Sequence, residues 1–368
     1  MKILLLGDAS NYHKCLSAGL ARMGHDVTVA SDGTGWLNTG RDIDISRRPG
    51  RLGGALLWTK LSTLLSSRLR GYDIVQLRGV GFVSLRPSRI LSLFRRLRRD
   101  NGRVFMTSLE TDNAFVRACT ASDSPLRYSE WRLSGAPTPW SDSAQADRAG
   151  WLSDELRDMT DYIYTHVDGV VSALYEYDAV CRRMYPQVPL AYGGLPVDLS
   201  ALGPAAVSGR KRLRMAFCAH KGREGEKGAD LLLPLAQELA SRHPERLELI
   251  APPNMPYARF LEFLRTVDVV FDQLYSYTPA TTALLSMALG AVPVSGAEPE
   301  YYDFIGESEL RPILNPDPTD LDATYRAMES VLTDPALFER MRADGREFVR
   351  RHNDVDVVAR RFSEFWQR

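Results

Sequence analysis

Cysteine is scarce in this 368-residue sequence, and long apolar runs are missing from it. The four cysteines, Cys15, Cys119, Cys181 and Cys218, lie far apart and form no CxxC pair, which argues against a zinc site and against a disulfide framework. No stretch of about eighteen apolar residues occurs, so no membrane-spanning helix is expected. The first apolar segment meets Gly7 too early for a signal peptide. The cysteine pattern predicts a protein of the reducing cytoplasm.

The sequence also has no excess of either charge, because 46 Lys and Arg balance 46 Asp and Glu. Nothing global therefore suggests a nucleic-acid partner. The charge is uneven, however: residues 41–103 hold fifteen Lys and Arg against four Asp and Glu, whereas residues 104–200 hold seven against fourteen. Segments 56–70 and 89–103 mix apolar residues with Arg, and such segments can lie on an anionic membrane. A core-facing stripe with a solvated basic face is the alternative.

The dinucleotide-binding pattern G-x-G-x-x-G is missing after the first strand. Ala9 and Tyr12 occupy its second and third glycine positions, so an NAD-type site is not expected. A strand that leads into a helix N-terminus still favours ligand binding there. We expect Asn11 and His13 to point from this loop, Asn11 towards an acceptor and His13 as a catalytic candidate. A capped helix with a solvated His is the alternative.

Short apolar strands alternate with amphipathic helices along most of the chain. The alternation predicts an α/β protein with two Rossmann-like domains, whose parallel sheets face each other across a cleft. A Gly/Pro/Ser-rich stretch at 193–211 marks the boundary, which gives domains at residues 1–200 and 201–350. The last helix, at 351–368, is expected to pack back on the first domain. Residues 120–150 are rich in Ser, Asp, Pro and Ala, and we expect a long surface insertion there.

Arg223 and Lys227 lie four residues apart among glycines, in a loop between a strand and a helix. Such a pair can bind a diphosphate, the Arg as a fork and the Lys as a point charge. It would also stabilise charge that develops on a leaving phosphate. A solvated charged loop is the alternative.

A second anion site is predicted between Asp272 and Glu300. There a strand ends, a Ser/Thr/Pro loop follows, and a helix begins near Pro279 to Thr281. Proline in the first turn of a helix, with Thr hydroxyls beside it, leaves free backbone donors that can bind an anion. Taken alone, the segment is a buried strand–helix–strand unit.

Three segments together resemble one known family. KGADLLL (227–233), VDVVFDQ (267–273) and ALLSMALGAVPVSGAEPE (283–300) are similar to the C-terminal half of the retaining group-4-like glycosyltransferases of the GT-B fold. The Asp-Gln pair after the strand resembles a divergent bacterial subgroup of polysaccharide-type transferases. The N-terminal GLARMGHDVTV and the ending REFVRRHNDVDVVARRFSEFW are also typical of the family, so the resemblance extends along most of the chain.

The resemblance implies a hexosyltransferase-like enzyme that moves a sugar from a UDP- or GDP-sugar to a saccharide or lipid-linked acceptor, with retention and without a metal or other cofactor. Arg223, Lys227 and Glu300 match catalytic positions of the family. The residues implied in donor binding are Gly228, Asn254, Tyr257, Tyr277, Thr278, Thr281, Thr282 and Glu298.

Two departures from the family concern its paired glutamates, eight residues apart. Tyr277 and Leu285 stand at those positions. A leucine cannot accept a hydrogen bond from a ribose hydroxyl, so nucleotide recognition must differ from the family pattern or be lost. We interpret the change as divergence.

Glu110 and Asp112 follow a strand of the first domain, where they could contact acceptor hydroxyls. Capping of the next helix is the alternative for Asp112. The D-x-D patterns at 42–44 and 354–356 resemble a metal-binding motif of the other glycosyltransferase fold. One lies in a basic stretch and the other begins the last helix, so no metal site is expected.

The predicted function is therefore glycosyl transfer in bacterial cell-surface polysaccharide or glycoconjugate synthesis, in the cytoplasm and at the inner membrane face. Domain closure would exclude water from the donor. A non-catalytic nucleotide-sugar-binding paralogue is the first alternative. A nucleotide-sugar epimerase on the same fold is the second, and it would need positioned acid and base groups.

Overall fold

The computed structural model describes residues 1–368 except 35–36, 51, 206–209, 218–223 and 254. The chain folds into two compact units. Unit 1 consists of Met1–Pro125, Ala146–Asp198 and Val355–Arg368, and unit 2 consists of Leu126–Gln145 and Leu199–Asp354. Each unit is therefore built from segments that are not continuous in the sequence.

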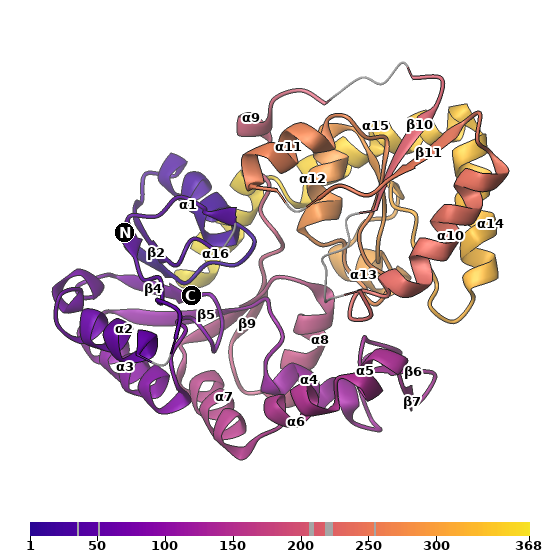
Figure 1. The fold of residues 1–368 in the computed structure, drawn as a ribbon. Coiled ribbons are helices and arrows are strands. Elements are labelled where there is room, and N and C mark those ends of the chain that lie inside the picture. Colours follow the sequence, from indigo (N-terminus) through magenta and orange to yellow (C-terminus); the bar gives the residue numbers. More distant parts are fainter. Residues whose placement is uncertain (35–36, 51, 206–209, 218–223, 254) are drawn as a thin grey trace. The chain divides into compact units, whose positions relative to one another are not determined.

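Unit 1 contains a parallel sheet (Figure 1). Where the chain is described, its strand order is β3 (Ile43–Asp44), β2 (Asp26–Ser31), β1 (Lys2–Leu6), β4 (Ile74–Leu77), β5 (Arg103–Ser108), β8 (Gly169–Ser172) and β9 (Leu190–Tyr192). Because all these strands run in the same direction, their carboxyl ends meet at one edge of the sheet. Strands covered on both faces become apolar along their whole length, as in the buried run from Ile3 to Leu6.

Helices supply the rest of unit 1. They are α1 (Tyr12–Arg22), α2 (Gly53–Ser62), the 3-10 helix η2 (Ser66–Leu69), α3 (Pro87–Asp100), α4 (Asn113–Thr120), α6 (Gln145–Trp151), α7 (Asp154–His166), α8 (Tyr175–Met184) and α16 (Val355–Trp366). The apolar side of α3, at Ile90, Leu93, Phe94 and Leu97, is buried in the core with α2 and α7. Arg95, Arg98 and Arg99 of the same helix are exposed, as amphipathic periodicity predicts.

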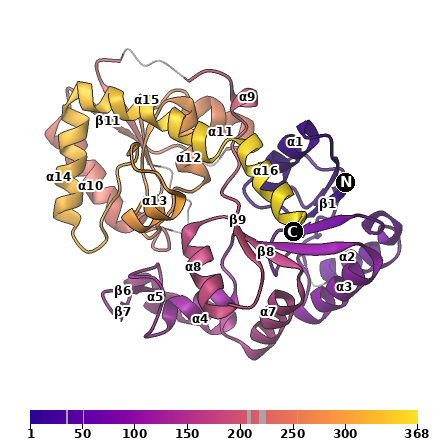
Figure 2. The ribbon, with the colours of Figure 1, turned by 180° about the vertical axis from the view of Figure 1, so that it is seen from behind.

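The last helix, α16, packs against α1, as Figures 1 and 2 both show. Trp366 is fully buried and donates an indole hydrogen bond to Gln76 Oε1 at 3.0 Å. At the other end of α16, Asp356 accepts from Arg22 Nε at 2.7 Å. The C-terminal segment is therefore part of the first core, which it reaches after the chain has built unit 2.

Unit 2 contains a second parallel sheet, in the described residues of order β11 (Leu247–Ile250), β10 (Leu213–Phe217), β12 (Val269–Phe271) and β13 (Val292–Val294). Its main-body helices are α9 (Leu199–Leu202), α10 (Ala229–Arg242), α11 (Tyr257–Leu264), α12 (Thr281–Leu289), α13 (Pro299–Ile305), α14 (Leu321–Thr333) and α15 (Pro335–His352). Seven consecutive residues of α12, from Ala283 to Leu289, are buried. Such a helix is held by packing, and its N-terminus lies at the carboxyl edge of the sheet.

Residues Leu126–Gln145, called the strap below, pack on unit 2 although they precede the rest of it in the chain by more than fifty residues. The strap contains the short strands β6 (Arg132–Leu133) and β7 (Ala136–Pro137) and the helix α5 (Pro139–Ser143). Tyr128 and Trp131 are buried in it. The predicted surface insertion thus contains a packed element, because its aromatic side chains find partners in unit 2.

Among the described residues, no helix is both long and apolar enough to cross a membrane.

Close packing of α1 on α16 yields a stability prediction. A Cβ added at Gly19 would lie 2.7 Å from the Val355 carbonyl oxygen and 2.8 Å from Ala359 Cβ. Gly19→Ala should therefore lower the free energy of unfolding by roughly 1–3 kcal/mol, despite the better helix propensity of Ala. Gly150→Ala in α6, where nothing beyond the adjoining residues and helix backbone lies within 4 Å of the new Cβ, is the control and should be neutral or stabilising by up to about 1 kcal/mol. Urea unfolding measures both, and equal effects would contradict the packing argument.

Candidate functional site

Asp8 and His13 lie at the carboxyl edge of the unit 1 sheet, in the loop after β1 and the first turn of α1. His13 is fully buried, and its Nδ1 lies 2.6 Å from the carbonyl oxygen of Gly7. A carbonyl only accepts, so Nδ1 carries the proton and Nε2 keeps a lone pair, which has no hydrogen-bond partner among the described residues. Burial lowers the pKa of His13 to about 4, so the imidazole is neutral at pH 7. The neutral, buried ring is neither the solvated His of the alternative interpretation nor a side chain that points into solvent.

Asp8 was not among the predicted site residues, yet it holds the start of α1. Its Oδ1 accepts from the His13 amide at 2.8 Å and its Oδ2 from Thr39 Oγ1 at 3.1 Å. Burial raises the pKa of Asp8 to about 6. Asn11, half-buried, precedes the helix in the left-handed conformation with φ 67°. The hydrogen bonds of Asp8 therefore hold the loop that carries Asn11.

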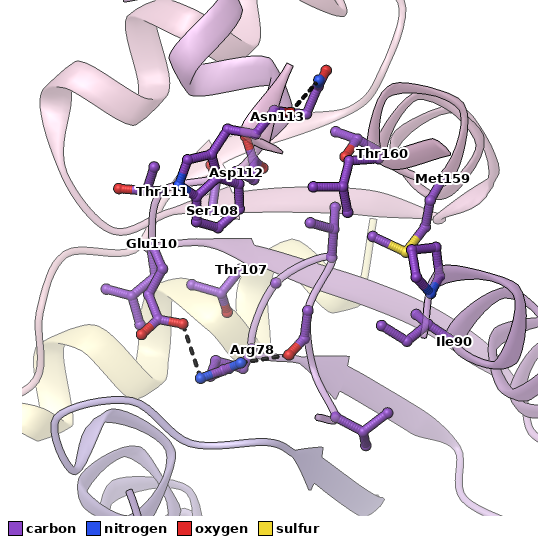
Figure 3. A pocket seen from close by; sticks show the side chains of 18 of the residues that line it. Arg78, Ile90, Thr107, Ser108, Glu110, Thr111, Asp112, Asn113, Met159 and Thr160 are labelled. Carbon is purple, nitrogen blue, oxygen red and sulfur yellow. Dashed lines mark hydrogen bonds and ion pairs between the residues drawn. The ribbon is translucent and has the colours of Figure 1, made fainter. Parts of the chain in front are cut away.

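Glu110 and Arg78 form the charged side of a pocket in unit 1 (Figure 3). Arg78 Nη1 lies 2.9 Å from Glu110 Oε2, and its Nη2 donates to the carbonyl of Gly81. The pocket has a volume of about 310 Å³, at the lower end of the usual range for small-molecule sites. Its wall is largely apolar, with Ile90 from α3 and Met159 from α7. Glu110, half exposed, is therefore available to a ligand at this edge.

Asp112 lines the same pocket but acts as the cap of α4. Its Oδ1 accepts from the Phe115 amide at 2.8 Å and its Oδ2 from the Tyr164 hydroxyl at 3.0 Å. Burial raises the pKa of Asp112 to about 6. Both carboxylate oxygens are already engaged, as the capping alternative anticipates. An acceptor contact by Asp112 stays a prediction.

In unit 2, Lys227 lies at the carboxyl edge of the sheet, with its Nζ 2.9 Å from Asp272 Oδ1. Asp272 directly follows β12, is 6% exposed, and has no described partner for its second oxygen. Gly228 caps α10 with φ 68°, a conformation that glycine adopts without strain. Arg223 and Asn254 lie outside the described residues. Asp272 was missed as a site residue because its pairing with Lys227 spans forty-five positions of the chain.

The loop between β12 and α12 carries Tyr277 and Thr278, which are both buried. Ala280 is the N-cap of α12, and its side chain makes no hydrogen bond to the first amides of that helix. Thr281 and Thr282 begin the helix and are half-buried. These amides can donate to an anion, and the helix dipole favours negative charge there.

Glu298 and Glu300 follow β13 and contact the strap. Arg127 donates to Glu300 Oε1 from Nε at 2.5 Å and to Glu298 from Nη2. Its hydrogen bonds lower the pKa of Glu300. The Tyr128 hydroxyl donates to Glu298 Oε1 at 2.7 Å. Neither strap residue was predicted, although three large aromatic side chains in a Ser- and Pro-rich stretch could have indicated a buried segment.

The remaining predicted positions are placed as follows. Tyr257 begins α11 and is half-buried, and Leu285 is buried on α12. Asp42 and Asp44 accept from the Val29 amide and from Arg41. Groups of three or more His, Cys, Asp or Glu side chains that could hold a metal do not occur in the part of the chain that the structure describes.

No family model matches the sequence, and no curated protein matches it. Solved structures do match over the full chain. Sucrose-phosphate synthase from Thermosynechococcus elongatus has a TM-score of 0.67 at 14% identity, with 100% of this chain and 98% of that chain covered. An alpha-glucosyltransferase in complex with UDP and a 13-mer DNA has a TM-score of 0.61 at 12% identity, and HepE from Anabaena, in complex with UDP and glucose, 0.59 at 12%. For both, 100% of this chain and 99% of that chain are covered.

At such identities the likeness establishes the fold. The chain has the α/β fold of the GT-B structures, and the predicted fold class is confirmed.

The buried cap of α4 gives a pH prediction. A carboxyl whose folded pKa is raised stabilises the fold below its unfolded pKa of about 3.8, and that stability is lost as the pH rises through about 6. Asp112→Asn keeps the shape and removes the titration. The advantage of the parent over Asp112→Asn should therefore shrink by at most about 3 kcal/mol between pH 4 and pH 7. Urea titrations of both proteins across this range measure it, and a constant difference would refute the assignment.

Proposed function

We propose that the protein is a glycosyltransferase that moves a sugar from a nucleotide-diphosphate-sugar, a UDP-sugar first of all, to a saccharide or lipid-linked acceptor. The observation that carries the proposal is the arrangement at one edge of the unit 2 sheet, in a fold shared along its whole length with glycosyltransferases. Lys227 and the uncapped amides of α12 lie at that edge. Cation and helix N-terminus together suit a diphosphate.

The donor would be held by unit 2. Lys227, together with Arg223, neutralises the diphosphate, while Thr281, Thr282 and the α12 amides bind its oxygens. Asp272 holds the Lys227 ammonium in place, so little reorganisation is needed as charge develops on the leaving group. Gly228 allows the backbone to approach the phosphates. The base would lie near Asn254 and Tyr257, and the sugar near Thr278, Glu298 and Glu300.

The acceptor would bind at the edge of unit 1, with a hydroxyl on Glu110. The Arg78–Glu110 pair offers both donors and acceptors to a saccharide, and the apolar pocket beside it suits a non-sugar part. Asn11, His13 and Asp112 complete the proposed acceptor side. Retention, independence of metal ions and a role in bacterial cell-surface polysaccharide synthesis belong to the same proposal. An acceptor of nucleic acid is not part of it, since the chain carries no net charge.

Lys227→Ala tests the donor site. Removal of one donor to the developing charge should lower turnover by roughly a hundredfold or more and weaken UDP binding. Lys227→Ala alone leaves the buried Asp272 carboxylate charged and unpaired, which destabilises the protein. The double variant Lys227→Ala/Asp272→Asn removes that charge, and it should show the same loss of turnover in a stable protein. Arg242→Ala, which removes an exposed ion pair with Glu238 on α10, is the control.

Calorimetry with UDP and GDP, followed by assays of sugar transfer and donor hydrolysis, provides the measurements. Normal turnover of the double variant would overturn the proposed phosphate site. Binding of UDP-sugar by the parent without transfer or hydrolysis would favour a non-catalytic paralogue.

We also propose that a surface around α2 contacts anionic membranes at the inner membrane face. Leu52, Leu56 and Leu64 are 75%, 53% and 76% exposed. Arginines of α3 lie beside them, since Arg89 and Arg96 donate to the carbonyls of Gly54 and Leu61 in α2. Exposed leucines among cations suit the boundary of an anionic bilayer.

Vesicle binding tests this surface. The triple variant Leu52→Ser/Leu56→Ser/Leu64→Ser should bind phosphatidylglycerol-containing vesicles at least about tenfold more weakly than the parent, because it loses buried apolar area. Met23→Ser/Leu152→Ser removes exposed apolar side chains elsewhere on unit 1 and should leave binding unchanged. Co-sedimentation measures the binding of both variants. Failure of the parent protein to bind anionic vesicles would contradict the proposed membrane surface.

A further inference from the structure

The strap touches the loops that follow β10, β12 and β13 at the carboxyl edge of unit 2. Trp140 packs against the loop of Lys227, because a Cβ at Gly225 would lie only 2.7 Å from its ring. Tyr128 stacks on Tyr277 of the loop after β12, with ring centroids 4.8 Å apart. Arg127 binds Glu298, after β13. Ligands of open parallel sheets bind at this edge, so a ligand of unit 2 meets the strap.

The contacts fix which part of a ligand the strap meets. The loop from Tyr277 to Ala280 connects two features of the site. Ala280 precedes the first amides of α12, and the Tyr277 ring contacts the Tyr128 ring and the Arg127 guanidinium. The Glu298 amide donates to the Tyr277 carbonyl at 3.0 Å, which ties the carboxylates to the same loop. A molecule whose phosphate lies on the α12 amides therefore has its next group beside Arg127, Glu298 and Glu300.

Arg127 has donors left for that group. Its Nε and Nη2 bind the two glutamates, and its side chain is 56% exposed. The guanidinium has five N–H groups, and the remaining ones lie on Nη1. Glu300 keeps its charge, since the Arg127 hydrogen bonds hold its pKa below the usual range. Donors and acceptors thus stand together, as the hydroxyls of a sugar ring require.

The local charge decides what kind of sugar fits. One guanidinium faces two carboxylates, so the cluster is negative by one charge. A third carboxylate, brought by a ligand, would be repelled by this net negative charge, whereas uncharged hydroxyls would not. Tyr128, which is buried and bonded to Glu298, keeps the cluster from rearranging around an anion.

We propose that Arg127 and Tyr128 of the strap form the sugar end of the donor site and select donors with an uncharged sugar over donors with an acidic one. The proposal rests on the proposed function and names the substrate class of that site. Arg127 both contacts the sugar and positions Glu298 and Glu300.

Calorimetry with UDP, UDP-glucose and UDP-glucuronic acid tests this role on the full chain. Arg127→Gln should weaken UDP-glucose binding roughly tenfold or more, because a charge-assisted donor is lost, while UDP alone binds within about twofold of the parent. Arg350→Gln is the matched control, since Arg350 also forms two hydrogen bonds with one glutamate, Glu347, in the same unit. Glu300→Gln should narrow the preference for UDP-glucose over UDP-glucuronic acid.

Each outcome separates the two proposals. A parent that binds no UDP overturns the proposed function itself. A parent that binds UDP, with Arg127→Gln equal to it on UDP-glucose, overturns the role of the strap alone. Tighter UDP-glucose binding by Arg127→Gln would mean that Arg127 hinders the donor, and would also overturn the proposed role of the strap. Thermal unfolding, with the UDP affinity, shows whether Arg127→Gln is folded; if it is not, the narrowed preference of Glu300→Gln decides.

Discussion

Glu298 is only 6% exposed, and its buried carboxylate must be compensated by hydrogen-bond donors. Among the described residues, three side chains donate to it: Arg127, the Tyr128 hydroxyl and Asn315, whose Nδ2 lies 2.9 Å from the same Oε1 as the tyrosine. Because two of the three come from the strap, the strap must dock before this loop is satisfied. The order of the carboxyl edge of unit 2 depends on this one buried charge.

The regular parts of the fold could be predicted because their signals are local. The alternation of apolar runs with helical periodicity predicts the α/β sheets, and the helix expected to begin near Pro279 to Thr281 begins at Thr281. Packing of the strap on unit 2 could not be predicted, since its contacts join residues about 150 to 170 positions apart and leave no periodic pattern.

The candidate site divides in the same way. The place of Lys227 at the edge of the sheet could be predicted from a cation among glycines after a strand. Its pairing with Asp272 could not, because a sequence pattern shows the type of a residue and not its contact partner. Asp112 was weighed as a cap or as an acceptor contact, and only the two hydrogen bonds of its carboxylate show which use the fold makes of it. The sequence predicts that His13 points from the loop. It is instead fully buried, which depends on packing that the local pattern does not show.

Because unit 1 needs α16 and unit 2 needs the strap, the order of synthesis differs from the order of assembly. The strap leaves the ribosome before the sheet on which it packs, and the first core stays open until α16 emerges. Contacts so distant in sequence slow folding, and both half-built units expose apolar surface meanwhile. A cut at any single position of the chain consequently yields no complete half, and a separately expressed unit 2 would need residues 126–145 joined to it.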